Sequence, residues 1–231
     1  MKTVGIIGGI GPESTVEYYR FIIEGYRERQ RDGSYPSIVI NSVDLDRLVK
    51  WINSDEMEPF TDYLVGEVQR LERAGVDFVV LAANTAHIVF DQIHARTSVP
   101  LISIVEATRD KVLSLGLKRP SLFGTGFTMR GQFYPNAFGK AGLPVITPNE
   151  EEKAFIHEKY FGELLKSVFL PETRTRLLEI VDRMKERDEI DCLILAGNEL
   201  PLILRAPEHN GVPFLDTTRI HVERIVERLL S

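Results

Sequence analysis

The sequence contains one cysteine and one tryptophan among 231 residues. A single thiol excludes an intrachain disulfide and a cysteine-rich metal site. Every apolar run falls short of the roughly 18 to 20 residues that span a bilayer, so we expect no membrane partner. The net charge is -6, and no block of lysine and arginine offsets it. Because nucleic-acid binders usually carry a basic face, we expect no nucleic-acid partner either, and the expected ligand is a small molecule.

The remaining composition is that of an ordinary globular protein. With 43% hydrophobic and 27% charged residues, the chain can bury one or two cores. An apolar segment begins already at Val4, which leaves no room for a secretory leader, so we expect a cytoplasmic protein. Cys192 starts another apolar run, where a buried thiol acts as a small hydrophobe.

Three pairs of segments resemble each other at similar offsets. The offsets are 114, 113 and 117 residues, and the pairs are Phe78–His87 with Cys192–Pro201, Val99–Ser103 with Val212–Asp216, and Val4–Gly9 with Ser121–Gly126. A period of this length is the size of a domain, not of a solenoid repeat. The chain is therefore expected to be a duplicated α/β unit.

Short β-branched runs alternate with amphipathic stretches, which is typical of parallel βαβ sheets. The expected strands are Val4–Gly8, Ser37–Asn41, Phe78–Ala82, Leu101–Ile104, Ser121–Gly124, Val145–Thr147, Cys192–Leu195 and Phe214–Asp216. The expected helices are one capped by Ser14 and Thr15, then Thr61–Ala74 closed by Gly75, Thr173–Arg187 and Arg219–Leu230. Caps and helical spacing of the apolar residues define these helices.

The predicted fold is α/β, with two similar doubly wound parallel-sheet domains related by a pseudo-twofold axis. The first domain is residues 1–107 and the second is 108–218, and the C-terminal helix 219–231 is expected to pack back on the first. Because ligands bind at the carboxyl ends of parallel strands, we expect a ligand cleft between the two domains.

The first segment that could carry chemistry is the glycine-rich turn Gly8–Thr15, which includes Ile10. Its backbone amides and the following helix could bind a small anion, or the segment could be a simple tight turn. Its spacing matches neither the dinucleotide fingerprint nor the Walker loop.

The duplicated strand ends supply polar groups. Asn84 and Thr85 follow one strand, and Asn198 and Glu199 follow its repeat partner. Asn84, Thr85 and Asn198 could be helix caps, with Glu199 as a first-turn carboxylate. Alternatively, these residues could hold a small carboxylate at the free amides of the next helix.

Other polar side chains lie beside these motifs. The turn Gly124–Met129 adds the hydroxyls of Thr125 and Thr128. His87 could shuttle a proton, since its ordinary pKa is near 6.5, or it could only orient its neighbours. The spacing of Asp, Glu and His indicates no metal site, and we find no Ser-His-Asp arrangement.

Taken together, these motifs resemble those of the aspartate/glutamate racemase family, the amino-acid racemases that work without pyridoxal phosphate. Gly8–Thr15 resembles its opening loop, Ala83–His87 its Cys-Asn-Thr-x-His motif, Leu195–Pro201 its Leu-Gly-Cys-Thr-Glu-Leu-Pro motif, and Phe214–Thr217 with His221 its closing segment. The resemblance covers the whole chain. It implies a homodimer, no cofactor, and a small amino acid or dicarboxylate as ligand.

The resemblance also reveals a defect. In that family two thiols flank the substrate α-carbon, and the corresponding positions here are Ala83 and Gly197. Cys192 lies five residues before Gly197, at about 3.3 Å per strand residue, so it belongs to the opposite end of its strand. Glu199 and His87 are then the titratable groups left in the motifs.

The basic residues that bind the substrate's side-chain carboxylate in that family have only loose counterparts in this sequence. Arg47 is one candidate and Lys166 another. Three hypotheses follow: a racemase homologue that moves protons through other groups, a non-catalytic binder of small carboxylates, or another enzyme of the superfamily. The missing thiols weaken the hypothesis of another superfamily enzyme as much as that of a racemase homologue.

Overall fold

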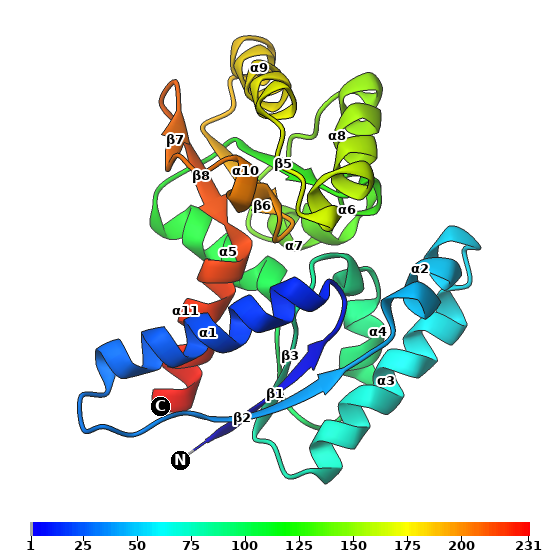
Figure 1. The fold of residues 1–231 in the computed structure, drawn as a ribbon, viewed down its shortest axis with the longest axis vertical. Helices are drawn as coiled ribbons and strands as arrows, with labels where there is room; N and C mark the ends of the chain where they lie inside the picture. Colours follow the sequence, from blue (N-terminus) through cyan, green and yellow to red (C-terminus); the bar gives the residue numbers. More distant parts are fainter. Residues whose placement is uncertain (1) are drawn as a thin grey trace. The chain divides into compact units, whose positions relative to one another are not determined.

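The structure is a computed structural model that describes residues 2–231. The chain forms two compact units (Figure 1). Unit 1 extends to Ile104 and includes His221–Ser231, and unit 2 is Val105–Ile220. Each unit contains one four-stranded sheet in which parallel pairing dominates. This confirms the predicted α/β class with two parallel-sheet domains.

The sheet of unit 1 has the strand order β2-β1-β3-β4, and all its pairs are parallel. Its strands are β1 (Thr3–Gly8), β2 (Ser37–Ser42), β3 (Phe78–Leu81) and β4 (Leu101–Ile102). Its helices are α1 (Pro12–Arg29), α2 (Leu45–Asn53), α3 (Met57–Arg73), η1 (Thr85–Val89) and α4 (Phe90–Ala95). The last helix of the chain, α11 (Thr217–Leu230), extends into this unit.

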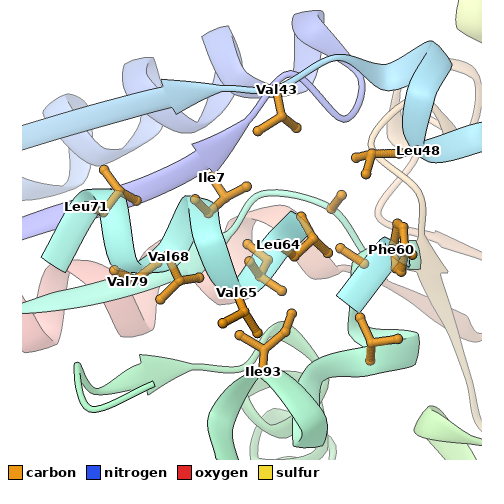
Figure 2. Close-up of a cluster of buried hydrophobic side chains, with 14 of the residues drawn as sticks. Ile7, Val43, Leu48, Phe60, Leu64, Val65, Val68, Leu71, Val79 and Ile93 are labelled. Carbon is orange, nitrogen blue, oxygen red and sulfur yellow. The ribbon is translucent and has the colours of Figure 1, made fainter. Parts of the chain in front are cut away.

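Helices cover both faces of this sheet. On one face, Leu64 and Val68 of α3 pack with Ile7 and Val79 of the sheet (Figure 2). On the other face, a second cluster joins α1 and α11 to alternate strand residues; it includes Tyr18, Ile22, Val4, Val80, Val222 and Ile225. Burial on both faces explains why β1 and β3 read as continuous apolar runs.

The sheet of unit 2 has the order β5-β6-β8-β7, with β7 and β8 antiparallel. Its strands are β5 (Pro120–Gly124), β6 (Cys192–Ala196), β7 (Glu208–His209) and β8 (Val212–Asp216). Its helices are α5 (Ile104–Ser114), α6 (Gly126–Arg130), α7 (Phe133–Gly139), α8 (Glu150–Gly162), η2 (Leu164–Lys166), α9 (Pro171–Asp188) and α10 (Leu200–Ile203). Apolar residues of α8 and α9, such as Ile156 and Leu177, pack with β6 in one core.

The strand orders show the duplication that the sequence predicts. The consecutive strands β1-β3-β4 of unit 1 correspond to β5-β6-β8 of unit 2. The counterpart of β2 is reduced to a single parallel bridge between Ser121 and Ile146. Ile146 is held there by two backbone hydrogen bonds, to Pro120 at 2.9 Å and from Leu122 at 3.0 Å. The predicted strand Val145–Thr147 is therefore wrong.

Several predicted element ends also differ from the structure. Helix α1 begins at Pro12 after Gly11, so Ser14 and Thr15 are not its caps, because they already lie within its first turn. The predicted strand Leu101–Ile104 stops at Ile102, and Ile104 begins α5. The predicted closure of α3 is correct, since Gly75 follows the C-cap with φ of 79°. Within residues 2–231 each helix is too short or too polar to cross a bilayer.

Candidate functional site

The turn after β1 contains two glycines with positive φ. Gly9 and Gly11 have φ of 83° and 87°, a region that favours glycine, and Ile10 lies between them. The amide of Gly9 donates to Thr15 Oγ1 at 2.8 Å, and Ser14 Oγ donates to the carbonyl of Ala82 at 3.1 Å. This turn therefore already satisfies one of the amides that were expected to meet an anion.

The turn after β3 carries Ala83, Asn84 and Thr85. Ala83 belongs to the apolar core under α3, with 5% of its surface exposed. Asn84 is buried at the start of η1, and its carbonyl accepts from the amide of His87 at 2.9 Å. A polar side chain is thus buried next to a methyl group at the carboxyl end of β3.

His87 is held by backbone groups at both ring nitrogens. The amide of Ile104 donates to Nε2 at 3.2 Å, so Nε2 is unprotonated and Nδ1–H donates to the carbonyl of Ala83 at 2.9 Å. Burial is the main cause that lowers the pKa of His87 to about 4. The ring is therefore neutral near pH 7, and its geometry favours an orienting role over a proton shuttle.

His221 continues this buried arrangement from α11. Its Nε2–H donates to the carbonyl of Ile102 at 3.1 Å, and its Nδ1 accepts from the hydroxyl of Tyr18 at 2.8 Å. Its ring lies edge-on to that of His87, with centroids 6.5 Å apart. Burial, followed by the charge of His87, lowers the pKa of His221 to about 3. His221 thus connects the C-terminal helix to β4 and α1, and its neutral ring lies beside that of His87.

In unit 2 the predicted binding residues come together at the ends of β5 and β6. Thr125 caps α6, since its Oγ1 accepts from the amide of Thr128 at 3.2 Å, and the two hydroxyls lie 3.1 Å apart. After β6, the Asn198 side-chain oxygen accepts from the Thr218 hydroxyl at 2.5 Å. Asn198 and Glu199 are both buried. The threonines and Asn198 are therefore already oriented by neighbouring hydroxyl and amide groups.

Gly197 lies directly against the side chain of Tyr160. A Cβ at Gly197 would lie 2.5 Å from the phenol oxygen of Tyr160, 2.6 Å from its Cε2 and 2.9 Å from its Cζ. The hydroxyl of Tyr160 donates to Oε2 of Glu199. The ring of a helix residue therefore occupies the space that any side chain at 197 would need.

Both members of this pair are removed from water. Tyr160 is 5% exposed and Glu199 is 7% exposed. Burial raises the pKa of Glu199, while the hydrogen bond from Tyr160 acts in the opposite direction. Burial and the adjacent Glu199 charge hold the pKa of Tyr160 well above its usual value, although the backbone amides of Glu199 and Asn198 favour its ionised form. The phenol is thus protonated and the carboxyl is easier to protonate than an exposed glutamate.

Sequence reasoning missed the contribution of α8 to this strand end. Tyr160 and His157 are three residues apart, so they share one face of that helix. Nδ1 of His157 accepts from the amide of Gly126 at 3.0 Å, and burial followed by the charge of Arg130 lowers its pKa. The three-residue spacing of a histidine and a tyrosine was a usable signal.

Other predicted residues lie elsewhere. Arg47 lies in the first turn of α2, and its guanidinium stacks 4.6 Å from the Trp51 ring centroid and 4.8 Å from that of Tyr63. Lys166 ends the short helix η2 and is exposed. Cys192 is the first residue of β6 and is fully buried, which raises the pKa of its thiol.

Comparisons with known proteins agree with this architecture. Residues 7–225 match the family described as Asp/Glu/hydantoin racemase. The chain is 30% identical to the broad-specificity amino-acid racemase RacX of Bacillus subtilis, over 99% of this chain and 98% of that protein. Among solved structures, a candidate Asp/Glu racemase from Yersinia pestis has a TM-score of 0.92 at 28% identity, with both chains fully covered. An aspartate racemase homologue from Pyrococcus horikoshii has a TM-score of 0.85 at 32% identity, also with full coverage of both chains.

Proposed function

Because the chain belongs to the Asp/Glu/hydantoin racemase family, we propose that it binds a small amino acid or dicarboxylate at the carboxyl ends of its parallel strands. In unit 1 the proposed binding residues are Ile10, Asn84, Thr85 and Arg47. In unit 2 they are Thr125, Thr128, Asn198 and Glu199. We further propose a cytoplasmic homodimer that needs no cofactor.

The same proposal holds that the protein cannot run a two-thiol racemisation. Ala83 and Gly197 are taken as the two thiol positions, on the resemblance of their motifs. The observation that carries this step is the contact at Gly197, where even a Cβ would overlap Tyr160. Cys192 is no substitute, because its buried thiol lies at the start of β6 and a buried thiol is a poor nucleophile.

A non-catalytic binder is the alternative function. It is favoured by the unit 1 strand end, where Ala83 offers only a methyl group and both nitrogens of His87 are hydrogen-bonded to the backbone. In that case the protein would bind or sense a carboxylate without changing it.

Ligand-dependent stability tests the binding that both functions share. We expect one or more of L- and D-aspartate, L- and D-glutamate, other amino acids, malonate and succinate to raise the melting temperature. The stabilisation should grow as RT ln(1 + [L]/Kd), about 2.7 kcal/mol at one hundred times Kd. Asn198→Ala and Asn84→Ala should weaken it, whereas Asn53→Ala, at the exposed end of α2, should not. A flat melting temperature across the whole panel would refute the proposed function.

A further inference from the structure

The side chain of Tyr160 occupies the space beside Gly197, the position of unit 2 that has no side chain. Helix α8 delivers its ring to Gly197, and the phenol oxygen is the atom nearest to the missing Cβ. A reactive group at this strand end therefore exists, although it comes from a residue 37 positions earlier in the chain. Tyr160 itself lies outside the motifs that carry the racemase resemblance.

The phenol is also connected to a proton acceptor. Its hydroxyl donates to the Glu199 carboxylate, and both groups are buried. A carboxylate in a dry site is a stronger base than one in water, because burial disfavours its charge. Tyrosine and glutamate are both established general acid–base groups when they are positioned against the reacting atom.

We propose that Tyr160 and Glu199 are the proton-transfer pair of unit 2, acting on the α-carbon of the bound amino acid. The inference rests on the proposed function, since it needs that ligand at this strand end. The α-carbon–hydrogen bond breaks and its proton moves to the phenol oxygen, while the phenol proton moves to Glu199. The electron pair stays on the α-carbon as a carbanion. The phenol and carboxyl protons exchange with water before the return, and the reverse movement then delivers a solvent proton to the same carbon.

The stereochemical outcome follows from the use of a single pair. Tyr160 both removes and returns the proton, so both transfers occur on the same face of the α-carbon. The reaction is exchange of the α-hydrogen with solvent and retention of configuration, not racemisation.

Exchange in deuterium oxide tests the pair. The protein is incubated with L- and D-aspartate, L- and D-glutamate and further amino acids, and α-deuterium is measured by NMR together with chiral analysis. We expect deuterium in at least one enantiomer with its configuration retained. Tyr160→Phe and Glu199→Gln should each slow exchange by about 100-fold or more, within the usual contribution of a general acid–base group. Tyr160→Phe should still be stabilised by the ligand.

Two control variants accompany the test. Tyr26→Phe changes another buried tyrosine, in α1 of unit 1, and Glu158→Gln changes an exposed glutamate of α8; both should exchange like the unmodified protein. Stabilisation by a ligand without any deuterium incorporation would overturn the pair but leave the proposed binding intact. Exchange at the unmodified rate in Tyr160→Phe would also overturn it, and inversion would overturn the one-face reaction. No stabilisation and no exchange would overturn both proposals.

Discussion

Gly197→Ala is the smallest perturbation that probes the contact at this strand end. The added Cβ would lie 2.5 to 2.9 Å from three atoms of the Tyr160 side chain, whereas carbon atoms in contact are about 3.5 to 4.0 Å apart. Both residues are buried in the region between α8 and β6, so the ring or the strand end must move. Overpacking of this kind costs about 1 to 3 kcal/mol, and we expect the free energy of unfolding to fall by about 2 kcal/mol.

Backbone strain adds nothing to this expected cost. Gly197 is not among the glycines with positive φ, so an L-residue can adopt its backbone conformation. A comparison glycine in the same unit is Gly139 at the end of α7, where an added Cβ would meet open space. Gly139→Ala should leave stability unchanged or raise it by about 0.5 to 1 kcal/mol, as alanine does in a helix.

A double-mutant cycle assigns the cost to the tyrosine. Tyr160→Leu removes the three atoms that the Cβ would meet, so Gly197→Ala should cost nearly nothing in that background. Urea unfolding is followed by circular dichroism, which reports both units, because the one tryptophan, Trp51, lies in unit 1 and would report only that unit. Residues in contact show interaction energies of about 0.5 to 3 kcal/mol. An equal cost of Gly197→Ala in both backgrounds would refute the claim that Tyr160 fills this space.

Three further predictions concern stability and reactivity. The pKa of His87 falls from 6.5 in the unfolded chain to about 4 in the folded one, so its contribution to stability is complete above pH 6.5 and is lost as the pH falls toward 4. Protonation of His87 should lower the free energy of unfolding by about 2 kcal/mol between pH 7.5 and 5. His87→Gln should remove this share of the pH dependence measured by urea unfolding, while the share of His221, whose pKa is also lowered, remains. Cys192 should react with a thiol reagent only as unit 2 opens, so labelling that is as fast as that of a free thiol would contradict its burial. Thr15→Val removes the acceptor of the Gly9 amide, and urea unfolding should show a loss of about 1 to 3 kcal/mol.

The sequence predicted those parts of the fold that depend on local pattern. Continuous apolar runs marked β3 and β6 correctly because every residue of both strands is buried, and Gly75 marked the end of α3 because its φ of 79° favours glycine. Val145–Thr147 failed because only one of its residues pairs with β5. Such a reduction depends on the partner strand, which a local pattern does not contain.

The sequence predicted the residues of the candidate site that follow the strands, but not the residues that other elements bring to the strand ends. Asn198 and Glu199 follow directly from β6, so the duplicated motif located them. Tyr160 is far away in sequence, on a helix whose charged residues gave no clear apolar stripe, and only packing brings its ring to Gly197. The hydrogen bonds that hold His87 neutral have the same origin, since the amide of Ile104 meets its ring only in the folded unit.

The two positions that the motif resemblance assigns to the thiols therefore differ in their structural surroundings. Ala83 keeps its Cβ, which packs in the apolar core under α3, so a cysteine there would add one sulfur atom to an existing side chain. Gly197 has no Cβ, and its space belongs to Tyr160, so a cysteine there also requires removal of a buried ring and leaves the Glu199 carboxylate without its hydrogen-bond donor. Under the proposed assignment of the thiol positions, the first unit has only a methyl group at its position, whereas a tyrosine fills the space at the second. This asymmetry, set against sheets that still share three strands in the same order, is why any remaining proton chemistry is expected in unit 2.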